Sequence, residues 1–211
     1  MPPKKSTHIR REEIVQAALQ VIGEKGVHGL TITEIAGRAG MSDANIYRHF
    51  TGKQEILGAL GDFIGEAVMG KAAGIAAGEG TAVEKLKIIF LAHAALIAAN
   101  PGLPRFMFSE EIHLGEPHLA KTIADKMAGY IETLSKVIAA GIKNGEFRSL
   151  SPRETAITLL GMIQFTALRW SITRGAFNLD AEAKRLWDNF LRLTQISSSP
   201  VSAEANPMGA V

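Results

Sequence analysis

The chain has 211 residues, of which 46% are hydrophobic and 21% charged, and it contains no cysteine. This composition is typical of a folded globular protein and excludes a disordered chain, while the lack of cysteine excludes disulfides, thiolate metal sites and a cysteine nucleophile. The formal net charge is only +2, but residues 1–53 hold eight basic and five acidic side chains, which indicates a polyanionic partner at this end.

The sequence shows no targeting or membrane signal. The basic N-terminus is followed by Glu12 and Glu13 instead of an apolar run, which argues against a signal peptide. The most apolar stretch, residues 88–99, is shorter than the roughly 20 residues that a membrane-spanning helix needs. We therefore expect a soluble, cytoplasmic protein with no membrane partner.

Periodic apolar residues predict an all-α fold of about nine helices. The first helix covers roughly residues 10–25, where one helical face carries the apolar residues Ile14, Ala17, Ala18, Val21 and Ile22. Gly26 lies where a left-handed C-cap ends such a helix.

Residues 31–50 predict two short helices separated by a tight turn. Thr31 and Glu34 form a capping-box pattern that begins the first helix, and Gly40 ends it. Ser42 follows two residues later and caps the second helix. Two short helices joined by a glycine turn predict a helix-turn-helix.

Six further helices are expected, at residues 53–77, 81–99, 105–113, 117–144, 152–175 and 180–196. Capping-box patterns begin two of them, at Thr81 and Ser151, and Asp180 caps the last. The helix at residues 53–77 is rich in glycine, which indicates close packing or a pliable lever.

The predicted helices divide the chain into three parts. Residues 1–52 form a helix-turn-helix domain, and residues 53–197 form a larger helical domain. Residues 198–211 are rich in Ser, Pro and Ala, and we expect them to be a disordered tail.

The second short helix carries side chains suited to reading DNA. Ile46 and Phe50 are four residues apart and therefore face the interior together. Ala44 and Arg48 then point outward. Asn45 can pair with adenine, and Arg48 can pair with guanine or with a phosphate.

Residues beside this helix suit the DNA backbone. Tyr47 and His49 can donate hydrogen bonds to phosphate oxygens, and Lys53 begins a helix whose N-terminus already favours anions. Thr31 and Ser42 are either phosphate contacts or helix caps only. Tyr47 is either a contact or a packing residue.

The run from Thr31 to Leu57 resembles the DNA-binding signature of the tetracycline-repressor (TetR) family. The Thr, the Ile-Ala, the Ala-Gly, the Tyr-x-His-Phe and the following Lys fall in register, and the motif resemblance covers about residues 10–60. Beyond residue 60 only the number and order of helices match.

The resemblance implies a role for each matching position. Phosphate contacts are implied for Thr31, Tyr47, His49 and Lys53. Base-facing positions are implied for Asp43, Ala44, Asn45 and Arg48. An acid at position 43 is repelled by phosphate, but it can accept a hydrogen bond from cytosine or cap its own helix, and its role stays open.

The resemblance also implies a function. The chain is expected to be a transcriptional regulator, a repressor by family default, that binds a palindromic operator in double-stranded DNA as a homodimer. A small-molecule effector of unknown identity releases it. A palindrome requires two-fold symmetry in the protein.

The dimer interface is expected on the last two helices. They carry large apolar residues, of which we name Phe165, Leu168, Leu186, Trp187 and Phe190. The alternative is that these side chains form the core of one protomer.

The effector pocket is expected within residues 53–175. Aromatic, Met and polar residues amid apolar neighbours are the candidates, namely His93, Phe106, Met107, His113, Tyr130, Gln164 and Trp170. The alternative is that they belong to an ordinary core.

Other functions find little support in the sequence. His113 and His118 lie near three glutamates, but their spacing is irregular and suits a solvated loop, so we expect no metal and no cofactor. No phosphate-binding glycine loop or catalytic triad is present, which argues against an enzyme. The remaining alternative is a DNA-binding protein of the same fold without an effector, acting in chromosome organisation or division.

Overall fold

The computed structural model describes residues 7–196. The N-terminal residues 1–6 and the tail predicted for residues 198–211 lie outside the described residues. The predicted all-α class is confirmed: within residues 7–196, the regular structure consists of helices and one isolated β-bridge between Phe147 and Gln195. None of these helices is long and apolar enough to cross a membrane.

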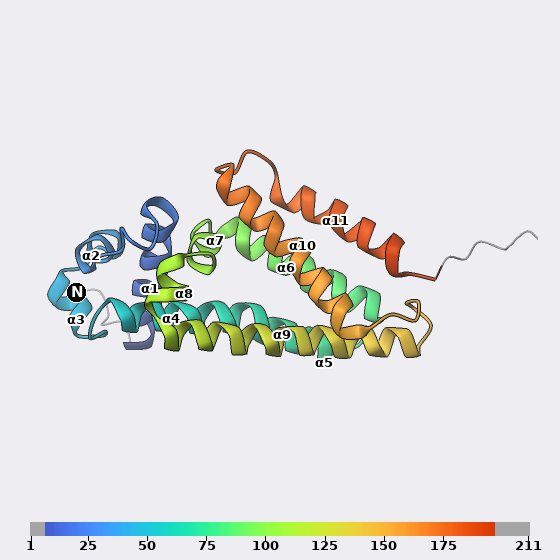
Figure 1. Ribbon diagram of the computed structural model, residues 1–211. Coiled ribbons are helices and arrows are strands. Elements are labelled where there is room, and N and C mark those ends of the chain that lie inside the picture. Colours follow the sequence, from blue (N-terminus) through green and yellow to red (C-terminus); the bar gives the residue numbers. More distant parts are fainter. Residues whose placement is uncertain (1–6, 197–211) are drawn as a thin grey trace, which may run out of the picture.

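Three helices at one end of the molecule form the predicted helix-turn-helix unit (Figure 1): α1 (Thr7–Lys25), α2 (Ile32–Ala39) and α3 (Asp43–Tyr47). Thr31 caps α2 and Ser42 caps α3 by accepting backbone N–H groups. Gly40 adopts a left-handed φ of 64° between the two helices, a conformation that glycine adopts without steric penalty. The unit has its own apolar core, whose fully buried side chains include Ile14, Ile22, Ile35, Ile46 and Phe50.

The glycine-rich helix predicted at residues 53–77 is continuous, but its middle is wound as a π-helix. It consists of α4 (Lys53–Gly65), the π segment η1 (Glu66–Gly70) and α5 (Lys71–Ala77). Glycines occupy the positions just before η1 and at its end, and none of its residues is buried. Single π turns within α-helices occur often at functional sites, and α4 leads into this one directly from the helix-turn-helix unit.

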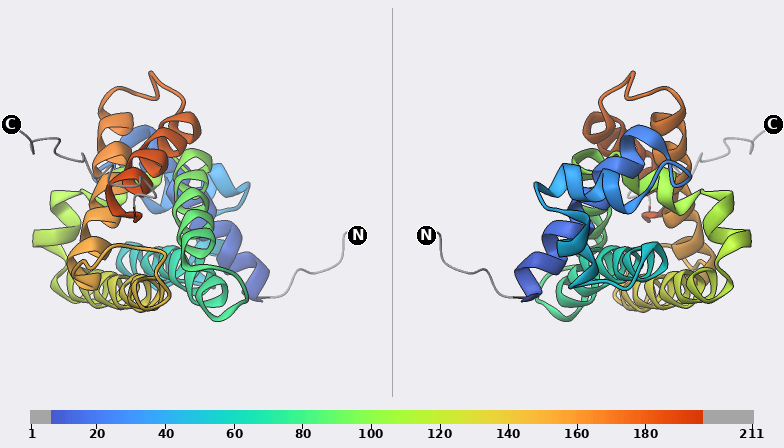
Figure 2. Two further views of the ribbon diagram at one scale, coloured as in Figure 1. Left: turned by 90° about the vertical axis from the view of Figure 1, so that its right-hand side faces the viewer. Right: turned by 90° about the vertical axis from the view of Figure 1, so that its left-hand side faces the viewer.

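The rest of the chain forms a helical body that packs against the continuous helix of α4, η1 and α5. Its helices are α6 (Ala82–Ala99), α7 (Gly102–Met107), α8 (Glu110–Gly115), α9 (Pro117–Lys143), α10 (Pro152–Ile172) and α11 (Leu179–Thr194). The α9 helix runs beside α4 and α5, while α10 and α11 cover α6 on the opposite side (Figures 1 and 2).

A close backbone approach joins the body to the helix-turn-helix unit. A Cβ atom at Gly102, the first residue of α7, would lie 2.1 Å from the Leu19 carbonyl oxygen of α1. Only glycine fits there, because a side chain would force the two helices apart. The α7 helix is thus packed directly on α1.

Some predicted boundaries were wrong. The single short helix expected at residues 105–113 is two helices, α7 and α8, because the chain leaves helical geometry at Phe108 and restarts after Ser109. The cap of α11 is Asn178 and not Asp180, since the Asn178 side chain accepts the Ala181 N–H at 2.8 Å. Ser151 precedes α10 without a side-chain capping bond.

Candidate functional site

The α3 helix presents a polar surface at the end of the molecule. Ile46 and Phe50 are fully buried, which fixes the helix with its other faces outward. Six of the nine residues predicted to contact DNA are exposed, namely Thr31, Ser42, Asp43, Ala44, Tyr47 and Arg48. The other three, Asn45, His49 and Lys53, are half-buried. Tyr47 is an exposed aromatic side chain, with 57% of its surface accessible, and so does not serve as core packing.

Several of these side chains already have partners within the protein. Ser42 Oγ accepts the Asn45 N–H at 3.3 Å, and Thr31 Oγ1 accepts the Glu34 N–H at 3.2 Å. Asp43 Oδ2 accepts a hydrogen bond from Thr33 Oγ1 at 2.7 Å, which ties α3 to α2. Of the two alternatives for Thr31 and Ser42, capping is therefore observed in both.

Arg11 fastens the helix-turn-helix unit to the start of α4, and sequence reasoning missed it. Its guanidinium lies 3.9 Å from the centre of the Phe50 ring, donates to the His49 carbonyl and reaches Glu55 Oε1 at 3.0 Å. Glu55 also accepts the Thr51 N–H at 2.8 Å. The Thr51 N–H and then Arg11 lower the pKa of Glu55. One cluster thus links α1, the end of α3 and α4.

A second link supports the same junction. Lys53 Nζ, at the first residue of α4, donates to the Val27 carbonyl at 2.9 Å. The junction therefore ties α4 to the loop after α1 as well as to α1 itself.

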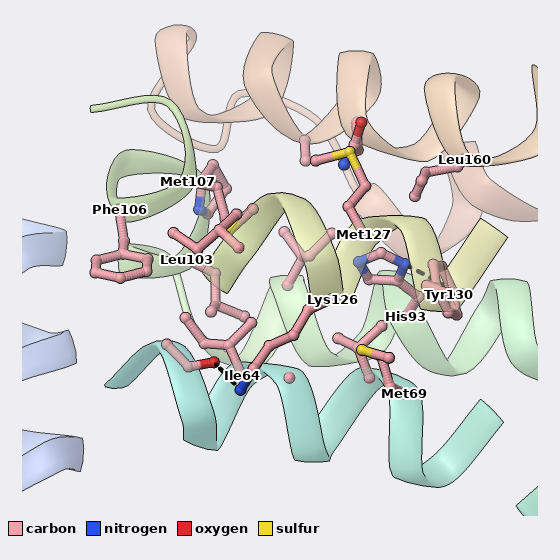
Figure 3. A pocket seen from close by; sticks show the side chains of 18 of the residues that line it. Ile64, Met69, His93, Leu103, Phe106, Met107, Lys126, Met127, Tyr130 and Leu160 are labelled. Carbon is pink, nitrogen blue, oxygen red and sulfur yellow. Dashed lines mark hydrogen bonds between the residues drawn. The ribbon is translucent and has the colours of Figure 1, made fainter. Parts of the chain in front are cut away.

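The body contains a cavity of about 100 Å³ between α4, η1, α6, α7, α9 and α10. Figure 3 shows its apolar walls, to which Ile64, Met69, Leu103, Met127 and Leu160 contribute. Ligand pockets for small molecules usually measure ~300–1,000 Å³. The cavity is therefore smaller than a usual ligand site and has to widen to hold a ligand of ordinary size.

A polar pair lies at one side of the cavity. Tyr130 Oη is 3.4 Å from His93 Nδ1, and the two rings meet edge to face with centroids 5.6 Å apart. Burial lowers the pKa of His93 to about 4 and raises the pKa of Tyr130. Both groups are neutral at pH 7, so the pair offers hydrogen bonds without charge.

The structure brings most of the predicted pocket residues together. Five of the predicted seven line the cavity: His93, Phe106, Met107, Tyr130 and Gln164. His113 and Trp170 do not. His113 is exposed on α8 with Nε2 2.8 Å from the Met107 carbonyl, and Trp170 Nε1 donates to the Phe177 carbonyl at 3.1 Å, near the end of α10.

The residues predicted for the dimer interface fall into two groups. Trp187 and Phe190 are only 1% and 2% exposed within one protomer, where they pack against each other and Trp187 packs against Phe90. They have no surface to offer a second copy, which corrects that part of the prediction. Leu168 and Leu186 are half-buried, and Phe165 is 66% exposed.

Comparison with known protein families gives two matches along the chain. Residues 14–60 match the family described as bacterial regulatory proteins, tetR family. Residues 79–194 match the family described as tetracyclin repressor-like, C-terminal domain. Together the matches cover most of the α1–α3 unit and most of the helical body.

Two curated proteins are similar over most of their length. The chain is 30% identical over 178 residues to the fatty acid metabolism regulator protein of Bacillus subtilis, covering 80% of this chain and 87% of that protein. It is 31% identical over 158 residues to the nucleoid occlusion factor SlmA of Vibrio vulnificus, covering 74% of this chain and 80% of that protein.

Solved structures are similar in fold. The transcriptional regulator FadR of Bacillus subtilis, in complex with stearoyl-CoA, aligns with a TM-score of 0.72 and 26% identity over 85% of this chain and 97% of that one. The fatty acid degradation regulator FadR of Bacillus halodurans aligns with a TM-score of 0.75 and 26% identity over 90% and 97% of the two chains.

Proposed function

Because this chain belongs to the tetR family of bacterial regulatory proteins and is a DNA-binding transcriptional regulator, we propose that it is a repressor controlled by an effector with a long acyl chain. It binds a palindromic operator as a homodimer. Residues 1–52 form the DNA-binding domain and residues 53–197 the domain that binds the effector and the second copy.

The α3 helix enters the major groove. Arg48 and Asn45 face base edges, where they pair with guanine and adenine. Tyr47 and His49 donate to phosphates, and Lys53 adds its charge at the N-terminus of α4. The hydrogen bond that Asp43 accepts from Thr33 supports a structural role for this acid over base reading.

The cavity is the effector site, and its chemistry carries the proposal. Apolar and Met side chains dominate its walls, as an acyl chain requires, because burial of methylene groups drives such binding by ~0.8 kcal/mol each. The similar B. subtilis structure holds stearoyl-CoA, and a curated relative is a fatty acid metabolism regulator.

Release of DNA follows from the position of the cavity on the long helix. Ile64 of α4 and both Val68 and Met69 of η1 form part of the cavity wall. An effector that expands the cavity pushes on this helix, and the cluster at Arg11 and Glu55 carries the movement to α3. The effector needs only to bind the DNA-free arrangement more tightly than the DNA-bound one.

The test begins with selection of bound DNA from a random oligonucleotide pool, using the native protein, Asn45→Ala and Arg48→Ala. We expect a palindromic consensus whose preference at single positions relaxes in the variants, at about 1–3 kcal/mol for each lost base contact. Dodecanoyl-CoA should then release the native protein from that DNA. A consensus indifferent to both substitutions would contradict the assignment of α3.

The second candidate is a DNA-binding protein without an effector. The 31% identity to a nucleoid occlusion factor favours it, whereas the apolar cavity favours an effector. Thermal-shift measurements with a series of acyl chains distinguish the two. Stabilisation that rises with chain length supports the effector, and no shift with any chain moves the second candidate ahead.

A further inference from the structure

Lys126 crosses from α9 to α4 at the edge of the cavity. It is the only Lys or Arg among the residues that line this cavity in the described chain. Nζ donates to Asp62 Oδ1 at 2.7 Å and to the Gly61 carbonyl at 3.3 Å (Figure 3 shows the side chain reaching α4). An apolar cavity thus has one cation at its border, directed toward the helix that leads to the DNA-binding unit.

Gly65 on α4 leaves the space that this lysine occupies. A Cβ atom at Gly65 would lie 2.6 Å from Lys126 Cδ and 2.8 Å from Nζ, so any other residue at position 65 would displace the lysine. Gly61 lies one turn earlier and supplies the carbonyl that Nζ binds. Lys126 therefore lies between the inner cavity and an outer groove. It lines that groove together with Asp62 and Glu66.

The ion pair that holds Lys126 is easily replaced. The Asp62 side chain is 73% exposed, whereas that of Lys126 is 29% exposed. Pairs with such an exposed partner contribute little, because water screens the attraction. A cation beside an apolar cavity nevertheless needs an anion or a hydrogen-bond acceptor, and a ligand in the cavity approaches it from the less hydrated side.

We propose that Lys126 binds the anionic head of the effector and thereby selects an apolar chain ending in an anionic group over a neutral chain of equal length. The inference rests on the proposed function and names the chemistry of that site. When Nζ turns to the ligand, it leaves Asp62 and Gly61, so recognition of the head also frees α4. Free fatty acids and acyl-CoA thioesters both combine an apolar chain with negative charge.

Calorimetric titration of the full-length chain tests the proposal with three ligands of equal chain length: dodecanoate, dodecanoyl-CoA and dodecanol. The variants are Lys126→Met, which keeps the apolar stem, Lys126→Arg, which keeps the charge, and Asp62→Asn, which removes the competing carboxylate. A melting curve of each variant verifies that it is folded.

Lys126→Met should weaken binding of the anionic ligand by about tenfold or more, the effect of losing one charge-assisted hydrogen bond, and should leave dodecanol unchanged. Lys126→Arg should restore most of the affinity. Asp62→Asn should tighten binding of the anionic ligand by about two- to fivefold. Whichever of dodecanoate and dodecanoyl-CoA responds to these substitutions is the head that Lys126 contacts.

Two results would overturn the inference and leave the proposed function intact, and a third would overturn both. If the native protein binds acyl ligands but Lys126→Met binds dodecanoate and dodecanoyl-CoA as tightly as the native chain, Lys126 does not select the head. If Lys126→Met weakens dodecanol equally, the lysine only shapes the cavity. If the native protein binds none of the three ligands, the acyl effector itself is wrong and this inference fails with it.

Discussion

His93 places a titratable ring beside a mainly apolar cavity, and its burial has a consequence for stability. Burial lowers its pKa from 6.5 to about 4, because the folded environment disfavours the charged ring. The unfolded chain takes up the proton near pH 6.5. The stability that neutral His93 contributes is therefore complete above pH 6.5 and is lost as the pH falls toward 4.

Between pH 6.5 and pH 4, we expect the free energy of unfolding of the native chain to fall by about 2 kcal/mol more than that of His93→Gln. This is less than the full pKa shift implies, because the ring borders the cavity. Urea unfolding at pH 7, 5.5 and 4.5 measures it. The native chain and the variant should differ in slope with pH. Parallel pH profiles would show that His93 titrates normally in the folded protein.

At the scale of single elements, local signals were sufficient for the DNA-binding unit. The caps at Thr31 and Ser42 and the turn at Gly40 are short-range features, and α2 and α3 formed where they predicted. The capping box at Thr81 is also present in full, with Thr81 and Glu84 bonded in both directions. At Thr31 the box is incomplete, because the Glu34 carboxylate pairs with Lys25 at 2.6 Å instead.

Features that depend on tertiary packing were predicted less completely. Periodicity marked Phe165 and Trp187 alike as apolar, but it does not tell whether the covering surface belongs to the same chain or to a second copy. No sequence pattern distinguishes Lys126 from the other lysines of α9, since its role depends on the glycines of α4 opposite. The π turn at Glu66–Gly70 was missed for a related reason. A glycine-rich sequence does not tell α-helical from π-helical winding, which depends on how the helix packs against its neighbours.

The π segment gives a prediction that belongs to the long helix. A π turn holds one residue more than an α turn, so deletion of Ala67 should convert η1 into regular helix and keep α4 and α5 on the same faces. We expect stability within about 1 kcal/mol of the native chain, because η1 contributes no buried residue. The effector should then release DNA poorly, since a regular helix resists deformation at this point.

Deletion of Ala59 is the matched control. It removes a residue from the regular part of α4 and rotates the two parts of the helix by about 100° relative to each other. The fully buried Leu60 would be displaced, at about 2–5 kcal/mol. Urea unfolding and effector titration of the DNA complex measure both variants. If deletion of Ala67 lowered the free energy of unfolding as much as deletion of Ala59, the interpretation of η1 would be contradicted.

At the scale of the whole molecule, the cavity and the surface of α3 lie far apart and are joined by two connections. The cavity lies in the body, and α3 lies at the end of the molecule (Figure 1), with α4 and the contact of α7 on α1 between them. A dimer that reads a palindrome must hold two copies of α3 ~34–36 Å apart, one helical turn of DNA. Small rotations of α4 suffice to change such a separation.

The proposed dimer can use an exposed apolar surface on α10 and α11. Ile157, Phe165 and Ile172 follow one another on a single face of α10, with Phe165 66% and Ile172 71% exposed, and Leu193 on α11 is 67% exposed. Exposed Gly161 lies between Ile157 and Phe165 and leaves open space where a partner helix can approach closely. An apolar stripe of this kind on two adjacent helices is typical of a protein–protein interface.

Two substitutions distinguish apolar residues at the interface between copies from those in the core of one protomer: Phe165→Asp and Trp187→Ala. Phe165→Asp should leave the protomer folded, because the side chain is exposed within it, but should shift sedimentation from dimer to monomer and weaken operator binding strongly, since a monomer contacts only one half-site. Trp187→Ala should instead destabilise the protomer itself by about 3–5 kcal/mol, as expected for loss of a buried aromatic side chain. Sedimentation and urea unfolding of both variants decide between the assignments. A Phe165→Asp protein that stays dimeric would move the interface away from α10, whereas a Trp187→Ala protein of native stability would contradict its place in the protomer core.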